Sequence, residues 1–548
     1  MSARFRVLAA AMVACLTLVA CGGSATPATV GGAASTTTAS TSQSTTSSSS
    51  AMFRFATQYQ PDTMDPAAAQ TVLEYQLLSL VYDALFTYHT SQMTLKDELA
   101  QSYAWSPDGK TLTVMLKPNV HFSNGDLLTA QDVAFSIERN LQPAVKSTYA
   151  ASYFGLVGAQ RYYDGKSTSV PGIQVVSPKE IKFVLKSPEP YFLNVLGLQN
   201  SFILDHHLPG DTASVSAHPL GTGPFILKSW VQNESMTFVR NPKYDLGPAP
   251  KIAGVTVTFG PDSNLQVLQF EKGSQDAVYN IASTNYLQIM NSKWKQDYVQ
   301  VPLPSISFLR MNPGLVPAFA KVQVRQAMNY AINKTKVIQD VLNGRGSPAT
   351  GPLPPGIPGY DASLQPYPYD PAKAKQLLAE AGYPNGFTVE FDMVPSDQNT
   401  KLAQIVQSMY AKVGVKMNIV DMQPAPYQQK YLAKKIAFGI GGWLLDYPDA
   451  EDFLYLLVDG HSPLNRTTYN NPQFDALVEK ADSITNQAQR VQLYSQADAI
   501  AHTDAPWVYL WFGVYDGLFQ PWVQPRTPDI LLNPILYTDW TKVSLASH

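Results

Sequence analysis

The spacing of apolar residues along the chain predicts strands and helices in alternation. Short runs in which every second residue is apolar are typical of strands, and apolar residues three or four positions apart are typical of helices. The expected strands are 53–56, 112–116, 181–185, 221–225, 255–259, 306–308, 387–391, 415–420 and 508–512. The expected helices are 74–85, 130–139, 324–332, 371–381 and 401–413, with one or two more within 474–499. The pattern therefore predicts a mixed α/β fold, and no fixed repeat period is present.

Turn and capping residues support these boundaries. Thr129 precedes one helix and Asp132 occupies its third position, which is a weak variant of the capping box. Asp370 and Pro371 begin another helix and Gly382 ends it. These signals place several helix ends before any long-range contact is considered.

The N-terminus reads as a targeting signal rather than as part of the fold. Arg4 and Arg6 precede a short apolar run over 7–20, and small residues precede Cys21. A run this short is too short to span a bilayer and is typical of a cleaved secretory signal. The Leu-Val-Ala-Cys sequence that ends at Cys21 resembles a bacterial lipobox. We therefore expect residues 1–20 to be a signal peptide and Cys21 to carry a lipid anchor, although an ordinary signal with a chance cysteine is the alternative.

Residues 21–50 follow as an expected flexible tether, because Ser, Thr, Ala and Gly dominate them and no residue is charged. The folded part then begins near residue 51. The chain has a net charge of −3 with 15% charged residues, and no basic stripe suggests a nucleic-acid partner. Its two cysteines lie at 15 and 21, so the mature domain is expected to have no disulfide and no thiolate chemistry.

Motifs spread over nearly the whole mature chain resemble one family, the family 5 extracellular solute-binding proteins, whose members bind peptides, nickel and related cargo. The matching blocks lie at 97–100, 105–110, 116–122, 124–126, 129–133, 221–225, 240–244, 324–327, 331–334, 378–383 and 443–449. Each block alone is a weak signal. Their shared order along the chain carries the resemblance.

The resemblance implies an α/β clamshell of the periplasmic-binding-protein type, with two lobes, a hinge and an extra inserted domain. Domain I would comprise 51–96, 216–311 and 515–548, domain II would be 97–215, and domain III would be 312–514. It also implies a monomeric, non-enzymatic substrate-binding component of an ABC importer, lipid-anchored on the extracytoplasmic face of the cell membrane. The expected partners are a small ligand, taken to be an oligopeptide, and the permease subunits, and no cofactor or metal is expected.

Four residues are candidate ligand contacts by that resemblance. Asp446 looks like the acid that receives a peptide ammonium, because a buried amine needs a paired anion to recover its desolvation cost. Its alternative role is to cap a helix or begin a turn. Trp443 would form an apolar wall or else pack in the core. Glu74 and Tyr75 would meet the ligand from the first lobe, or else lie on a solvated helix face.

The sequence departs from the family at one informative place. Some peptide binders carry an arginine shortly before the tryptophan to receive the peptide carboxylate, but residues 438–442 contain no cation. A peptide length set by that contact is therefore not expected, and longer peptides or a non-peptide ligand remain open.

Other functions were weighed against the binding role. No nucleophile elbow, zinc-protease motif or phosphate-binding loop is present, which argues against an enzyme. A metal or metal-chelate ligand is a rival because His206 and His207 are adjacent, but neighbours in an extended chain point to opposite sides. An oligosaccharide is a second rival, since Trp and Tyr platforms suit sugars. Signalling through a membrane sensor could coexist with transport.

Overall fold

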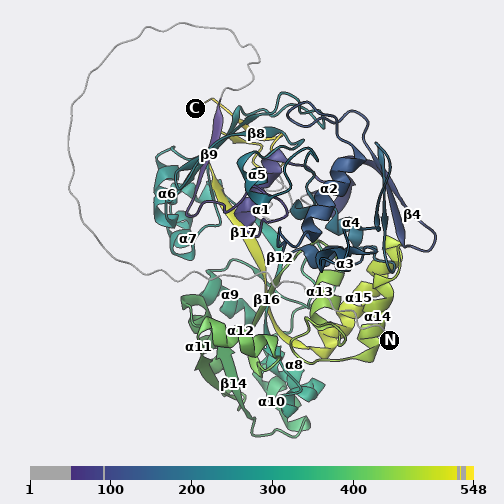
Figure 1. Cartoon of the computed structure of the whole chain (residues 1–548). Coiled ribbons are helices and arrows are strands. Elements are labelled where there is room, and N and C mark those ends of the chain that lie inside the picture. The colour runs from purple at the N-terminus through teal and green to yellow at the C-terminus, as the bar shows by residue number, and fades with distance from the viewer. Residues whose placement is uncertain (1–50, 90–92, 528–530, 532–538, 548) are drawn as a thin grey trace, which may run out of the picture.

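A computed structural model describes residues 51–89, 93–527, 531 and 539–547. The expected signal peptide, Cys21 and the expected tether lie outside these residues. Within them, eleven strands form one sheet in the order β15-β14-β16-β12-β17-β11-β1-β10-β9-β8, and β13 pairs with β17 (Figure 1). The bounds are β1 (Met52–Thr57), β8 (Phe225–Val231), β9 (Ser235–Arg240), β10 (Gly254–Phe259), β11 (Ala277–Tyr279), β12 (Tyr298–Met311), β13 (Ser347–Pro348), β14 (Thr388–Met393), β15 (Lys416–Asp421), β16 (Phe438–Leu444) and β17 (Trp507–Phe519).

The two long strands β12 and β17 join the two lobes of the molecule. They pair antiparallel, and both extend between the upper and the lower part of Figure 1. Their register shifts between Pro302 and Ile306. Proline has no N–H to donate, so Pro302 and Pro304 weaken the ladder at that point. The connection between the lobes therefore passes through a place where strand pairing is irregular.

The first lobe is built on β1 and β8–β11. Phe53, Phe55, Met236, Val255 and Val257 belong to its buried cluster. Its other elements are α1 (Val72–Val81), β2 (Phe86–His89), β3 (Thr94–Asp97), α5 (Thr212–Ala217), α6 (Ser263–Glu271), α7 (Ser283–Met290), η3 (Lys293–Asp297), β18 (Val523–Gln524) and β19 (Ser544–Leu545).

A side unit with its own core packs beside the first lobe. Its four-stranded sheet has the order β4-β5-β7-β6, and α2 covers it. The elements are β4 (Ala100–Trp105), β5 (Thr111–Leu116), α2 (Ala130–Leu141), η1 (Ala150–Tyr153), α3 (Ala159–Tyr163), β6 (Ile173–Ser177), β7 (Glu180–Val184), α4 (Phe192–Val195) and η2 (Gln199–Ser201). Tyr191 of this unit stacks on Tyr447 of the second lobe, with ring centroids 6.1 Å apart.

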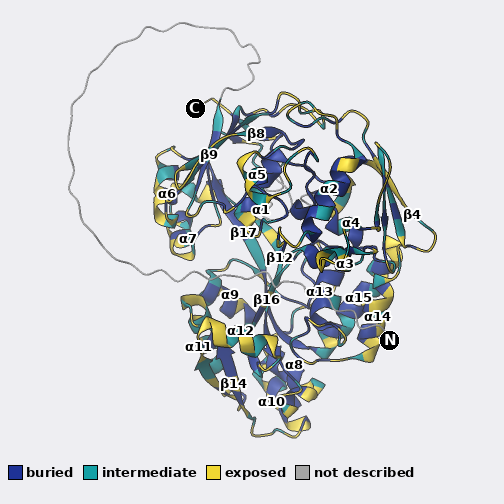
Figure 2. Cartoon of the chain, in the orientation of Figure 1, coloured by how far each residue is buried: buried dark blue, intermediate teal, exposed yellow. Residues whose placement is uncertain are grey.

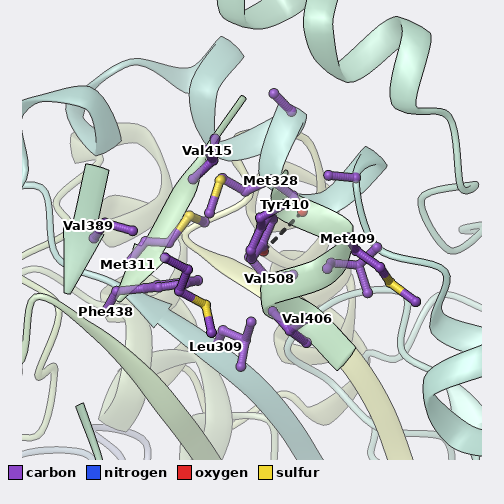
Figure 3. Packing of buried hydrophobic residues seen from close by; sticks show 14 of the residues in the cluster. Leu309, Met311, Met328, Val389, Val406, Met409, Tyr410, Val415, Phe438 and Val508 are labelled. Atoms are coloured by element: carbon purple, nitrogen blue, oxygen red, sulfur yellow. Dashed lines mark hydrogen bonds between the residues drawn. The ribbon is translucent and has the colours of Figure 1, made fainter. Parts of the chain in front are cut away.

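The second lobe contains most of the helices and has two buried clusters. One cluster packs Met311 and Phe438 from the sheet against Met328 and Tyr410, whose hydroxyl donates to the Met328 carbonyl at 3.2 Å (Figure 3). The other lies under α13–α15. The helices are η4 (Pro317–Ala320), α8 (Val322–Tyr330), α9 (Lys334–Leu342), α10 (Pro371–Glu380), α11 (Asp397–Ala411), α12 (Pro424–Leu432), α13 (Glu451–Val458), α14 (Pro472–Asp482) and α15 (Gln487–Asp504).

Burial follows this layering. Figure 2 shows the central strands as largely buried, while exposed residues lie on the outward faces of helices such as α6 and α12. Across the described ranges, no helix is both long and apolar enough to cross a bilayer.

The structure confirms the mixed α/β class and every strand predicted from spacing, within a few residues. The Thr129–Asp132 capping box and the Asp370 cap are both present. One helix boundary was wrong. The expected helix 74–85 is α1 at Val72–Val81, and residues from Phe86 onward form β2. The residues of 82–85 are almost all buried, so their apolar spacing reflects burial rather than helix. The three-domain division stays a prediction.

Candidate ligand-binding site

Trp443, near the end of β16, and Asp446, in the turn before α13, belong to one hydrogen-bonded unit. The Trp443 Nε1 donates to Asp452 Oδ2 at 3.1 Å, and the backbone N–H of Asp446 donates to the same oxygen at 2.9 Å. Asp452 lies in the first turn of α13, where the helix dipole favours an acid. Two of the predicted contacts are therefore brought together by one buried carboxylate.

Asp446 and Asp452 lack a matching cation among the described residues. The Asp446 carboxylate has no hydrogen-bond or ion-pair partner among the described residues, and Asp452 Oδ1 is buried without one. Burial raises the pKa of Asp446 to about 7, and the charge of Glu451 acts in the same direction. Burial and the charge of Asp446 also raise the pKa of Asp452 well above its ordinary value. A cation placed here would relieve both effects.

Two tyrosines on the opposite side of the turn are within electrostatic reach of Asp446. Tyr75 on α1 is buried and donates its hydroxyl to the Ala69 carbonyl at 3.2 Å. Burial raises its pKa to about 12, and the charge of Asp446 adds to the increase. Burial and the Asp446 charge also raise the pKa of Tyr149 well above its usual value. Tyr75 and Asp446 are therefore in electrostatic contact although they belong to different lobes.

Unlike the other three predicted residues, Glu74 uses its carboxylate to accept hydrogen bonds from backbone N–H groups. It is 2% exposed, so it does not lie on a solvated helix face. Its Oε2 accepts the N–H groups of Gln70 and Thr71 at 2.7 and 2.8 Å, and its Oε1 accepts that of Asp62 at 3.0 Å. This is the capping box of α1. A ligand contact of Glu74 stays a prediction, and the carboxylate would have to give up these amides to make one.

A small cavity, partly open to solvent, lies against Trp443. Its walls include Phe308, Arg310, Tyr431, Trp443, Leu457 and Trp507. The Phe308 and Trp507 rings stack at 3.8 Å with an interplanar angle of 12°. Gly441 lies opposite Phe308 in the β12–β16 ladder, and the absence of a side chain there makes room for the ring. The cavity therefore has aromatic walls and one charged side chain.

Residues 94–463 match the family described as bacterial extracellular solute-binding proteins, family 5 middle. The chain belongs to this family. Heme-binding protein A of Haemophilus influenzae is 31% identical over 522 residues, covering 90% of this chain and 92% of the relative. Glutathione-binding protein GsiB of Pectobacterium atrosepticum is 30% identical over 459 residues, covering 82% of this chain and 86% of the relative.

Solved structures show the same two-lobed fold. HbpA2 from Haemophilus parasuis superposes with a TM-score of 0.79 at 24% identity, covering 90% of this chain and all of that one. DppA from Helicobacter pylori, an ABC transporter-associated protein in complex with the peptide STSA, has a TM-score of 0.66 at 27% identity, covering 90% and 98%. This family 5 protein is therefore the extracytoplasmic substrate-binding component of an ABC importer, and its relatives are binding proteins rather than enzymes.

One expectation about histidines was wrong for this family 5 protein. The rings of His206 and His207 do not point to opposite sides, because their centroids are 4.0 Å apart. They lie in a turn rather than an extended strand. Each is held by its own carboxylate, with His206 Nδ1 2.6 Å from Asp132 and His207 Nδ1 2.7 Å from Asp205. Asp205, His206 and His207 also place their ligand atoms within 4.8 Å of one another, which is close enough to hold a metal ion.

Sequence reasoning missed Arg310. The arginine lies on β12 opposite Gly439 of β16. Gly439 belongs to the segment 438–442, which itself contains no cation. The signal was the alternation of Ile306, Phe308 and Arg310 on one face of a strand, but its partner strand is known only from the fold.

Proposed function

We propose that this protein captures an oligopeptide between its lobes and delivers it to the importer's permease. The observation that carries the proposal is the acid cluster of Asp446 and Asp452, in which one buried oxygen has no partner and both pKa values are raised. A peptide ammonium supplies the missing positive charge and hydrogen-bond donors. Two relatives support the ligand class, since one is named for glutathione, a tripeptide, and one contains a tetrapeptide.

Capture works by hinge closure. β12 and β17 are the strands that connect the lobes, and the irregular pairing at Pro302–Ile306 is where they can bend. A ligand that touches Tyr75 of one lobe and Asp446 of the other has more contacts in a closed state than in an open one. That differential affinity is what shifts the population toward closure.

The N-terminal segment completes the proposal. Lipidation at Cys21 with a tether over 22–50 would hold the mature protein at the outer face of the membrane, near its permease. The acyl chains of a diacylglyceryl group give a firmer anchor than a single chain. The domains act within a single monomer, with boundaries as predicted from the sequence.

Heme is a second candidate ligand. It is favoured by the 31% identical heme-binding relative. Native mass spectrometry of the purified mature protein, followed by gentle denaturation, separates the candidates. A ladder of released peptides supports the proposal, whereas a porphyrin or another single small molecule overturns the peptide assignment.

Replacing Asp446 with Asn tests the ammonium anchor. The change removes the anion and keeps the shape, so we expect affinity for Ser-Thr-Ser-Ala, measured by calorimetry, to fall about 10- to 100-fold. Acetylating the peptide's amine should cause a similar loss in the wild type and little further loss in the variant. Asp421→Asn, at an exposed position at the end of β15, is the matched control and should bind as the wild type does. Unchanged affinity in Asp446→Asn would refute the anchor.

A further inference from the structure

Arg310 is a buried guanidinium without an acidic partner. The residue is 9% exposed, and no carboxylate of the described chain forms an ion pair with it. Its Nη1 donates to the Ile440 carbonyl. The guanidinium carbon also lies 5.6 Å from the Phe308 ring centroid and 4.7 Å from that of Tyr431. Buried arginines are usually paired, so this one has capacity to bind an anion.

A second arginine shares the same tyrosine. The Arg466 guanidinium carbon lies 5.2 Å from the Tyr431 centroid, and its buried Nε has no hydrogen-bond partner. Burial and the charge of Arg466 lower the pKa of Lys434. Asp392, which is in register with Gly439, is already engaged by Lys430 at 2.6 and 2.7 Å. Positive charge is therefore in excess around Tyr431.

Arg310 places part of this positive charge at the wall of the cavity. Arg310 and Trp443 both line the cavity, and Trp443 is also bonded to Asp452. The cavity thus begins at a cationic group and ends beside the acid cluster. Gly439 and Gly441, which lie opposite Arg310 and Phe308, place no side chains between the strands on this face.

We propose that this cavity is a carboxylate-binding subsite, in which Arg310, with Arg466 beside it, receives a carboxylate of the ligand. The inference rests on the proposed function, because the same ligand presents its amine to Asp446. The cation that residues 438–442 lack is supplied by the neighbouring strand.

The test compares Ser-Thr-Ser-Ala with its C-terminal amide by calorimetry. The wild type should bind the free acid about 10- to 100-fold more tightly than the amide, since the amide removes the charge that strengthens the contact. Arg310→Ala should abolish this preference, and Arg466→Ala should reduce it. Arg161→Ala, which removes an exposed arginine on α3, should retain it in full.

The outcomes separate this inference from the proposed function. Equal affinity of acid and amide in the wild type overturns the subsite even if Arg310→Ala fails to fold, and so does a preference that survives in that variant. Loss of the carboxylate preference with the amine preference intact leaves the ammonium anchor standing. Loss of the amine preference with the carboxylate preference intact leaves the subsite standing and refutes the ammonium anchor. A protein that does not bind Ser-Thr-Ser-Ala at all counts against the subsite.

Discussion

Two aspartates three residues apart in the same turn have opposite electrostatic surroundings. Asp449 is fully paired, because both its oxygens bind the Arg490 guanidinium at 2.8 and 2.9 Å and Asn194 adds a further donor. Asp446 has no such partner, and its pKa rises to about 7 as a result of burial and Glu451. Asp449 is therefore neutralised within the fold, whereas Asp446 is not. Under the proposed function, the ammonium of a ligand neutralises Asp446.

The Arg139–Asp65 pair strengthens the same comparison. Both side chains are fully buried, and their nitrogen and oxygen atoms meet at 2.6 and 2.7 Å in a bidentate arrangement. Arg310 is almost as buried but forms no ion pair with an acid among the described residues. An uncompensated buried charge lowers stability, and an anion from the ligand would offset this cost.

The largest expected effect comes from breaking the paired aspartate. Arg490→Met leaves Asp449 buried without its cation, and such changes typically cost about 3–5 kcal/mol. We expect the denaturation midpoint in urea to fall accordingly. Asp446→Asn is the control in the same turn, and it should leave the midpoint unchanged or raise it, because it removes a charge that the fold does not neutralise. Comparable losses in both variants would remove the distinction between Asp449 and Asp446.

A smaller effect is expected at the border between the sheet and the cavity. A Cβ at position 441 would overlap the Phe308 ring, whereas at position 442 the nearest atom is the Ile306 carbonyl oxygen at 3.5 Å. Gly441→Ala should therefore displace the Phe308–Trp507 stack and cost about 1–3 kcal/mol, as overpacking commonly does. Gly442→Ala should cost little. Thermal denaturation of the two variants checks this, and equal melting temperatures would show that the stack is not tightly held.

The sequence predicted the fold well where local chemistry decides the structure. The Asp370 cap and Pro371 of α10 are examples, because capping depends only on neighbours in the chain. It failed where tertiary contacts decide. Tyr82, Ala84 and Leu85 are buried without being helical. Arg310 becomes informative only when β12 is placed beside β16 in a register that joins residues about 130 apart. Asp446 and Trp443 were predicted as ligand contacts from family motifs. That no cation pairs with Asp446 among the described residues could be seen only in the three-dimensional structure.

The smallest expected effect is a pH dependence that follows from the unmatched acid. In the free protein Asp446 is protonated below its pKa of about 7, while Glu451, Asp452, Tyr75 and Tyr149 provide no cation. A bound ammonium favours the ionised form, so binding below pH 7 must release a proton. Peptide affinity should therefore weaken as pH falls below about 7, by up to about tenfold per unit, and level off above it until the peptide amine itself deprotonates near pH 8.

Calorimetry in buffers of different ionisation enthalpy measures the released proton directly. Asp446→Asn should flatten the profile below pH 7 and remove most of that proton. A wild type whose affinity is constant from pH 5.5 to 7 would mean that the carboxylate is already ionised in the free cleft, and the contrast with Asp449 would then be one of geometry rather than of charge.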